Sequence, residues 1–416
     1  FTYLLGRVDP ARQLMCRGLA LLKELDRKGH DTRAEQAHAL LQSGSVTVDI
    51  DREEAKGYCE RSLELYRAVG DRWGTAKVLR VLGSVRRRLG LYGTETKQLL
   101  EESLALHATL GDRRGITQSR GTLANLLAFR SELEESACLY RESIASCRET
   151  GDKRLSIDLQ GDLVFVLLGL GEFAEARSRL KENLAICNNL GAKRELAYIL
   201  AVSSFTELHH GRYERARTRA DESRALASQI GLRWAWGSAL WYRGCAALAA
   251  EAHDEADESL QEGIAILSEL LQWDEVAAAG ATQAVVAIRR GRLPLAKQCL
   301  CESVRSVVEV GGFYSPMPTL SAIALYEAHR SREERAVELY ALAQCSPLVA
   351  KSRWYEDVFG HRIAAIGATL PPAVRAAAQE RGRSLDLAVV MAEQLVKLSP
   401  EGSSPKTPDD MLKADA

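Results

Sequence analysis

The sequence has few residues that break helices, and it has no long apolar run. Only 10 of its 416 residues are proline, which interrupts helices and central strands alike. Alanine, leucine, arginine and glutamate dominate, and all four favour helices. This composition predicts an all-α fold class. No apolar stretch approaches the roughly 20 residues that a membrane-spanning helix needs, so the sequence predicts no membrane partner.

The sequence also lacks an excess of one charge. Its 55 Lys and Arg residues against 56 Asp and Glu give a net charge of −1. A surface dedicated to nucleic acid would be strongly basic, so we expect this chain to contact no nucleic acid. The nine cysteines are odd in number and follow no disulfide spacing. Without a signal-peptide pattern, they indicate reduced thiols in a cytoplasmic protein.

Motifs that carry chemistry are missing as well. The sequence has no H-E-x-x-H, no G-x-S-x-G and no phosphate-binding G-x-x-x-x-G-K-[ST]. The adjacent His209 and His210 would point about 100° apart on a helix, which makes them poor joint metal ligands. We interpret them as a helix end with a favourable dipole contact. The sequence therefore predicts no catalytic residue, no metal site and no cofactor, and argues against an enzyme.

What the sequence does have is an internal repeat. A turn glycine recurs at 40-residue steps after one step of 41, and Leu271 replaces it once. Small residues and acidic residues recur with the same period. Each repeat divides into two segments with apolar residues at helical spacing, for example 152–169 and 173–190. The turn glycines are Gly70, Gly111, Gly151, Gly191, Gly231 and Gly311.

The stretch LYRAVGDRWG, residues 65–74, shows how one segment gives way to the next. Glycine adopts the positive φ that often ends a helix, and the aspartate after it can accept hydrogen bonds from the free N–H groups of the next helix. A two-residue connection of this kind predicts antiparallel neighbouring helices.

The recurring glycines, small residues and acidic residues resemble the tetratricopeptide repeat (TPR) in a long form of about 40 residues. GEFAEARSRLKENLAI (171–186) and GRYERARTRADESRAL (211–226) match its pattern of Gly-x-aromatic followed by small residues. Gly-Asp replaces the usual junction proline. The resemblance covers roughly residues 30–345, and it implies a right-handed superhelical α-solenoid with a concave groove lined by the first helix of each repeat.

The C-terminal segment 334–395 resembles the end of bacterial STAND signalling ATPases related to the AfsR and maltose-activator transcription regulators. The resemblance implies that this chain is a sensor and that an upstream nucleotide-binding domain is its partner. Because the sequence begins at Phe1 inside a helical pattern, we expect it to be a fragment. The matching residues are Ser352, Arg353, Trp354, Tyr355, Gly360, Leu370, Pro371, Pro372 and Gly382.

We expect three regions: a solenoid over 1–345 with a truncated first unit, a helical C-terminal cap over 346–398, and a disordered tail over 399–416. The first complete hairpin is expected from segments 31–43 and 51–69, joined by the longer connection SGSVTVDID. Regular hairpins should continue to about residue 310, followed by an irregular one over 315–345.

The groove-facing columns of the TPR pattern supply the candidate ligand-binding residues. The early repeats contribute polar and charged side chains, and the middle repeats contribute aromatic ones, a mixture that suits a peptide or protein segment. Arg80 with Asn125 resembles part of the carboxylate clamp of some TPR domains. Ordinary packing or solvation is the alternative for each residue. The candidates are Lys77, Arg80, Gln118, Asn125, Asp158, Asp162, Tyr198, Phe205, Trp241 and Tyr242.

The sequence therefore predicts a domain that senses an inducer, which is a peptide, protein or small molecule, and relays its binding to an upstream switch. A constitutive TPR scaffold for protein assembly, without ligand control, remains open as the alternative.

Overall fold

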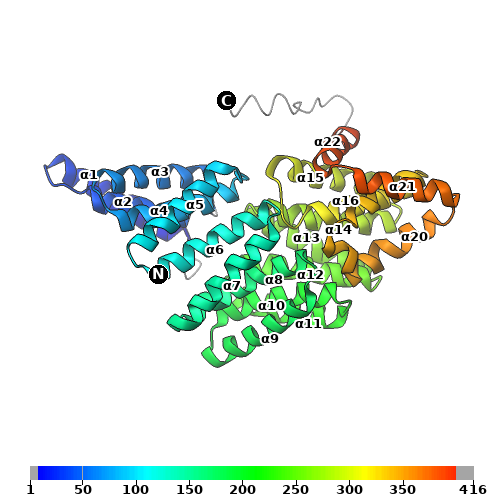
Figure 1. The fold of residues 1–416 in the computed structure, drawn as a ribbon, viewed down its shortest axis with the longest axis horizontal. Helices are drawn as coiled ribbons and strands as arrows, with labels where there is room; N and C mark the ends of the chain where they lie inside the picture. The colour runs from blue at the N-terminus through cyan, green and yellow to red at the C-terminus, as the bar shows by residue number, and fades with distance from the viewer. Residues whose placement is uncertain (1–7, 49, 400–416) are drawn as a thin grey trace. The chain divides into compact units, whose positions relative to one another are not determined.

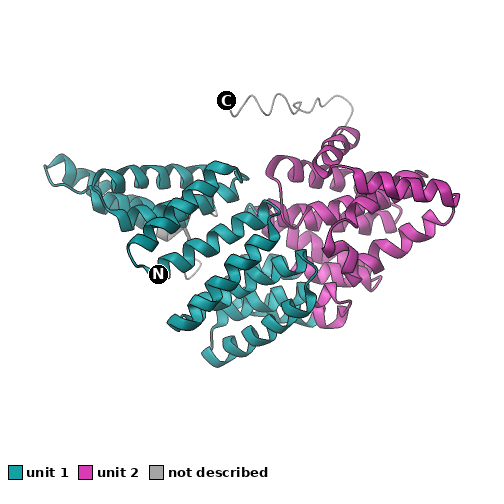
Figure 2. Ribbon diagram, in the orientation of Figure 1, with its two compact units in different colours: residues 1–206, 218–239, 269–271 teal, residues 207–217, 240–268, 272–416 magenta. Residues whose placement is uncertain are grey.

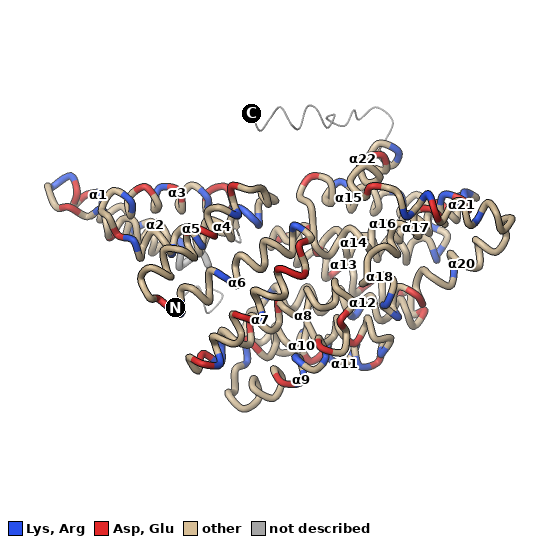
Figure 3. The backbone as a smooth tube through the Cα atoms, in the orientation of Figure 1, with Lys and Arg blue, Asp and Glu red and all other residues tan. Residues whose placement is uncertain are grey.

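The computed structural model describes residues 8–48 and 50–399. All regular elements in these ranges are helices (Figure 1), which confirms the all-α prediction. The expected disordered tail lies, apart from Ser399, outside the described residues. No helix in the described part is both long enough and apolar enough to cross a bilayer. Lys and Arg residues are interspersed with Asp and Glu along the helices (Figure 3).

The chain forms two compact units (Figure 2). Unit 1 contains residues 1–206, 218–239 and 269–271, and unit 2 contains 207–217, 240–268 and 272–416. This division does not follow the expected boundaries at 345 and 398, and those boundaries stay predictions. The helices up to α9 all lie in unit 1: α1 Val8–Arg27, α2 Arg33–Thr47, α3 Arg52–Ala68, α4 Arg72–Arg88, α5 Thr94–Thr109, α6 Arg113–Phe129, α7 Leu133–Thr150, α8 Lys153–Gly169 and α9 Phe173–Leu190.

Helices α10 to α12 are shared between the units, and the later helices lie in unit 2 apart from the last residue of α13. The shared helices are α10 Lys193–His209, α11 Tyr213–Ile230 and α12 Arg233–Ala249. The others are α13 His253–Glu269, α14 Trp273–Arg289, α15 Leu293–Val310, α16 Pro316–His329, α17 Glu333–Ala343, α18 Pro347–Lys351, α19 Arg353–Tyr355, the π-helix η2 Glu356–Gly360, α20 His361–Gly367, α21 Pro372–Ser384 and α22 Leu387–Leu398.

The Gly-Asp turns have the predicted geometry. Gly70 has a φ of +73°, and the Asp71 side chain accepts a hydrogen bond of 2.9 Å from the Gly74 N–H at the start of α4. Asp112 caps α6 and Asp152 caps α8 in the same way. Glycine ends one helix and aspartate begins the next, so consecutive helices form the short-linked hairpins of a TPR-like solenoid.

The backbone keeps this turn geometry even where the sequence has lost its glycine. Leu271 takes the place of a turn glycine at a φ of +55°. At the mid-repeat turns Ser131, Glu251 and Ser331 also have positive φ. A side chain in the left-handed region costs about 1–2 kcal/mol. Hairpin packing therefore fixes the turn conformation more strongly than the local residue does.

Buried hydroxyl groups link the two helices of several hairpins. Ser62 Oγ donates to the Ala37 carbonyl at 2.7 Å, and Ser103 Oγ donates to the Ala76 carbonyl at the same distance. Ser223 makes the equivalent bond to Ala197 at 2.8 Å. Ser103 follows Ser62 by one repeat and Ser223 follows Ser103 by three, so the same bond fixes the register of the two helices within each of these hairpins.

The first complete hairpin differs from its predicted boundaries. Helix α2 continues to Thr47, so SGSVT belongs to the helix and not to the connection. Gly44 lies at a close helix crossing, where an added Cβ would fall 2.6 Å from Cys59 Sγ. Tight packing against α3 explains the glycine, which the sequence alone presents as a turn residue.

We predict that Ser131→Gly stabilises the protein by about 1 kcal/mol, because Ser131 is exposed and holds a left-handed conformation that glycine adopts without strain. Urea unfolding measures the change. Ser228→Gly is the matched control: Ser228 is exposed inside helix α11, so its replacement should destabilise. A loss of stability in Ser131→Gly would contradict the account of the turns.

Candidate functional site

Seven of the candidate residues lie on four helices of unit 1: Lys77 and Arg80 on α4, Gln118 and Asn125 on α6, Asp158 and Asp162 on α8, and Tyr198 on α10. Helices α4, α6 and α8 pack side by side. Side-chain hydrogen bonds join the first helices of neighbouring repeats. Trp73 Nε1 on α4 donates to Asp112 Oδ2 at the start of α6, at 2.9 Å. Tyr198 on α10 donates to Asp162 Oδ1 on α8 at 2.7 Å. We call these seven residues together the inner face.

Helix α4 contributes two cations, Lys77 and Arg80, and neither forms an ion pair among the described residues. Lys77 Nζ lies 3.9 Å from the centroid of the Trp73 ring. Arg80 is half-buried, and its Nε atom is enclosed without a hydrogen-bond partner in the described part of the chain. Burial lowers the pKa of Arg80. Burial, and then the Arg80 charge, lower the pKa of Lys77. Asp112 and Asp71 oppose the decrease in the pKa of Lys77, whereas burial is the cause of the decrease for Arg80.

His107 of α5 lies close to this pair. Its side chain is 1% exposed, and its Nδ1 is 3.1 Å from Asp112 Oδ2. Burial lowers the pKa of His107, and the Arg80 and Lys77 charges lower it further, against the opposing effect of Asp112. A neutral imidazole therefore adds no positive charge beneath the two cations at neutral pH.

Helix α6 contributes amide side chains to the centre of the inner face. Gln118 and Asn125 are both half-buried there. Gly121 lies between them, and an added Cβ at this position would fall 2.5 Å from Leu159 Cδ2 of α8. The glycine thus lets α8 approach α6 closely. Asn125 lies near the buried Tyr140 hydroxyl, where burial raises the tyrosine pKa well above its ordinary value.

The two carboxylates of helix α8 have different surroundings. Asp162 accepts the hydrogen bond from Tyr198, and this bond and then the Arg87 charge offset part of the increase that burial causes in its pKa. Asp158 has no hydrogen bond or ion pair in the described structure. Burial raises the pKa of Asp158 to about 6, although Arg194 opposes the increase. Asp158 is therefore the carboxylate that lacks a direct partner.

The aromatic candidates are packed in the interior. Phe205 is 8% exposed and lies 5.8 Å from the Phe165 ring in unit 1. Trp241 and Tyr242, in unit 2, are 3% and 1% exposed. In this conformation they offer a ligand almost no surface, so a binding role for them stays a prediction. In unit 1, Trp73 is exposed and Trp234 is half-buried, and Trp234 lies 5.5 Å from the Tyr198 ring.

In unit 2 the C-terminal segment Ser352–Gly360 packs into the repeats. Trp354 Nε1 donates to the Cys245 carbonyl at 3.1 Å, and Tyr213 donates to Asp357 at 2.6 Å. Ser352 Oγ lies 2.7 Å from His209 Nδ1. Burial lowers the pKa of His209 to about 3. His209 lies at the end of α10, as the sequence predicted, and its burial favours the neutral imidazole.

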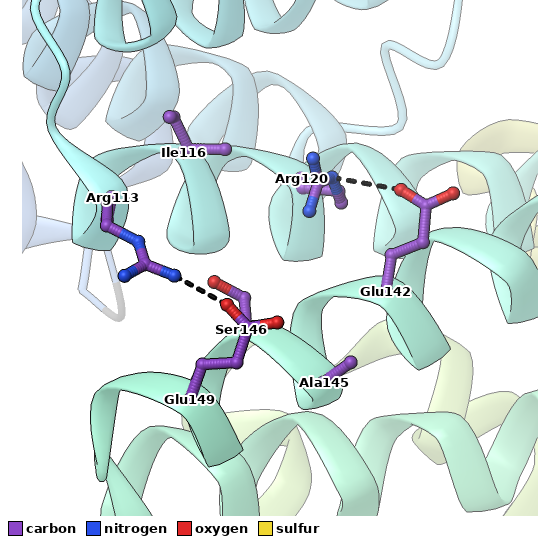
Figure 4. A pocket seen from close by; sticks show the side chains of 7 residues that line it. All are labelled: Arg113, Ile116, Arg120, Glu142, Ala145, Ser146 and Glu149. Atoms are coloured by element: carbon purple, nitrogen blue, oxygen red, sulfur yellow. Dashed lines mark hydrogen bonds and ion pairs between the residues drawn. The ribbon is translucent and has the colours of Figure 1, made fainter.

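A surface hollow of about 360 Å³ lies between α6 and α7 (Figure 4). Its charged residues already pair: Arg113 with Glu149 at 2.5 Å, and Arg120 with Glu142 at 3.4 Å. The hollow therefore offers a ligand no uncompensated charge. No cluster of His, Cys, Asp or Glu that could hold a metal ion occurs among the described residues. The inner face of unit 1 is the better candidate site.

We predict that Asp158→Asn stabilises the protein in a pH-dependent way. The folded-state pKa of about 6 lies above the ordinary value of 3.8, so wild-type stability falls as pH rises through this range. The variant and the wild type should have the same thermal midpoint near pH 4. Above pH 7 the thermal midpoint of the variant should be the higher one. Asp31→Asn is the control, because Arg33 lowers the pKa of Asp31. A difference in thermal midpoint between Asp158→Asn and the wild type that stays constant at all pH values would contradict this account of Asp158.

We predict that Trp354→Ala destabilises the protein by about 3–5 kcal/mol, because it removes a buried aromatic side chain and its hydrogen bond. Urea unfolding measures the effect. Trp273→Ala provides the comparison, since Trp273 is 38% exposed in the same unit, and it should cost much less. Equal losses in the two variants would show that segment 352–360 does not hold unit 2 together.

Comparisons with known proteins identify the fold alone. The chain matches no protein-family model and no curated protein. Its structure is similar to that of a Rap protein complexed with Competence and Sporulation Factor, at 13% identity, a TM-score of 0.59, and coverage of 88% of this chain and 100% of that chain.

Two further solved structures have lower TM-scores. A STAND protein with a tetratricopeptide repeat sensor from Pyrococcus horikoshii has 13% identity and a TM-score of 0.42, and the match covers 90% of this chain and 55% of that one. The Cut9–Hcn1 hetero-tetramer of APC/C has 14% identity and a TM-score of 0.37, over 96% of this chain and 88% of that one. With the hairpins and turns described above, the chain has the fold of a tetratricopeptide-repeat α-solenoid.

Proposed function

We propose that this chain is a ligand-sensing, protein-interaction TPR domain, and that the inner face of unit 1 binds its ligand. The observation that carries this proposal is Arg80. Its guanidinium is partly buried on the inner face, and no hydrogen bond or ion pair of the described structure compensates it.

Placing a charge in a partly buried position without a counter-charge costs stability. Proteins keep such unfavourable placements mainly at functional sites, where binding a ligand recovers the cost. Asp158 is a second instance on the same face. The surrounding amides and aromatic rings add hydrogen-bonding groups and apolar contact area, a combination that suits a peptide or a segment of a protein.

The similarity to the Rap protein supports this proposal, because that protein was solved in complex with Competence and Sporulation Factor. The resemblance of residues 334–395 to STAND regulators extends it. Under this proposal the domain works in the cytoplasm as the sensor of a signalling ATPase involved in transcription regulation. The inducer shifts the population of an upstream nucleotide-binding switch by binding one of its states more tightly.

A peptide-display selection on the full chain tests the proposal. The enriched peptides are resynthesised and titrated against the protein, with Trp fluorescence as the readout, because Trp73 and Trp234 lie beside the inner face. We expect Arg80→Met to weaken binding at least tenfold without lowering the thermal midpoint, since methionine keeps the apolar stem and removes the uncompensated charge.

Arg67→Met is the matched control, because Arg67 is exposed and pairs with Glu102 away from the inner face. It should leave affinity unchanged. The proposal fails if no peptide is enriched, or if the enriched peptides bind Arg80→Met as tightly as they bind the wild type.

A further inference from the structure

The uncompensated charges of the inner face have opposite signs and lie on different helices. Lys77 and Arg80 are on α4, and Asp158 is on α8, with α6 between them. No ion pair joins Arg80 to Asp158, and both keep the pKa shifts of charges without close partners. The inner face therefore has a positive side and a negative side that do not neutralise each other.

Asp162 lies about one turn after Asp158 on α8, and Arg87 lies about two turns after Arg80 on α4. The Arg87 charge of α4 lowers the pKa of Asp162 on α8, and Tyr198 donates a hydrogen bond to the same carboxylate. Arg87 also lies 4.7 Å from the ring of Phe129 at the end of α6. Asp162 therefore has a direct hydrogen-bond partner within the protein, whereas Asp158 and Arg80 have none among the described residues.

The groups around each charge strengthen this asymmetry. Arg80 has Lys77 and His107 near it, and His107 is kept neutral. Burial raises the pKa of Asp158, the exposed Arg194 opposes the increase, and the charges of Asp162 and Glu195 add to it. A cationic ligand group next to Asp158 would relieve repulsion among three carboxylates. An anionic group next to Arg80 would relieve repulsion between two cations.

Resting on the function proposed above, we infer that the ligand is a peptide segment of fixed charge order, with an acidic group bound at Lys77 and Arg80 and a basic group bound at Asp158. A Glu or Asp side chain or a C-terminal carboxylate fits the α4 side. A Lys or Arg side chain or an N-terminal amine fits the α8 side.

The helix spacing sets the distance between the two charges. Packed helices lie about 8–10 Å apart, so the two steps from α4 through α6 to α8 span roughly 20 Å. An extended chain advances about 3.3 Å per residue. The acidic and basic groups of the ligand should therefore stand about six residues apart, with the intervening residues over Gln118 and Gly121 on α6.

The test compares peptide-display selections on two forms of the full chain. On the wild type, the enriched sequences should carry one acidic and one basic group about six residues apart. On the doubly reversed variant Arg80→Glu with Asp158→Lys, the enriched peptides should carry the opposite charge order. Wild-type peptides should bind this variant at least tenfold more weakly, and their charge-swapped versions should recover the affinity.

Arg113→Glu with Glu149→Lys is the control, because it reverses an ion pair at the surface hollow and leaves the inner face intact. It should select the same charge order as the wild type. If the affinity of the enriched peptides depends on Arg80 but their sequences show no fixed order of acidic and basic groups, this inference is overturned and the proposed function still stands. If no peptide is enriched, or if none depends on the inner face, both are overturned.

Discussion

The two-residue turn between helices is the constraint on which the rest of this structure depends. A glycine in the left-handed region stops one helix, and the following aspartate caps the next at Asp71, Asp112 and Asp152. Because these connections are so short, each helix must fold back against its predecessor. Buried serines, such as Ser103 bonded to the Ala76 carbonyl, then fix the register between paired helices. The result is that residues 40 positions apart in the sequence become neighbours on one face.

That face carries charges which the scaffold itself does not need. Many charged residues of the described chain lie in exposed ion pairs, such as Arg67 with Glu102, which contribute little to stability. Arg80 and Asp158 differ, because each is partly buried and neither has a direct partner. They lower the stability of the free protein. This cost is the physical reason for assigning the ligand to the inner face of unit 1 and not to the charge-balanced hollow between α6 and α7.

Local signals in the sequence were sufficient for the repeat and for the turns. Helix ends depend on nearby residues, so the Gly-Asp pairs predicted helix boundaries well. Burial and pairing depend on the whole fold, and the sequence could not rank the candidates by them. Phe205, Trp241 and Tyr242 share the groove-facing pattern, yet they are packed inside. Trp73, whose ring lies under Lys77, was not predicted as a site residue, because it precedes Lys77, the first groove-facing position of its helix in the TPR pattern.

Contacts between distant parts of the chain were the least predictable. The partners of segment 352–360, including His209 and Cys245, precede it by more than 100 residues. The sequence of this segment has a distinctive pattern, but no feature of it predicts the surface on which it packs. Gly44 was predicted to lie in a connection, but it lies inside α2. Tertiary packing against Cys59 leaves no room for a side chain at this position. Both cases are decided by packing that no local pattern encodes.

A double-mutant cycle between Arg80 and the acidic residue of a bound peptide tests the central claim most directly. Affinities are measured for both forms of the protein, wild type and Arg80→Met, with the peptide carrying either its acidic residue or a glutamine or asparagine in its place. This account predicts a coupling energy of about 1.5 kcal/mol or more, as expected for a close, partly buried charge pair. Additive effects, with a coupling within about 0.5 kcal/mol of zero, would show that Arg80 does not face the acidic group.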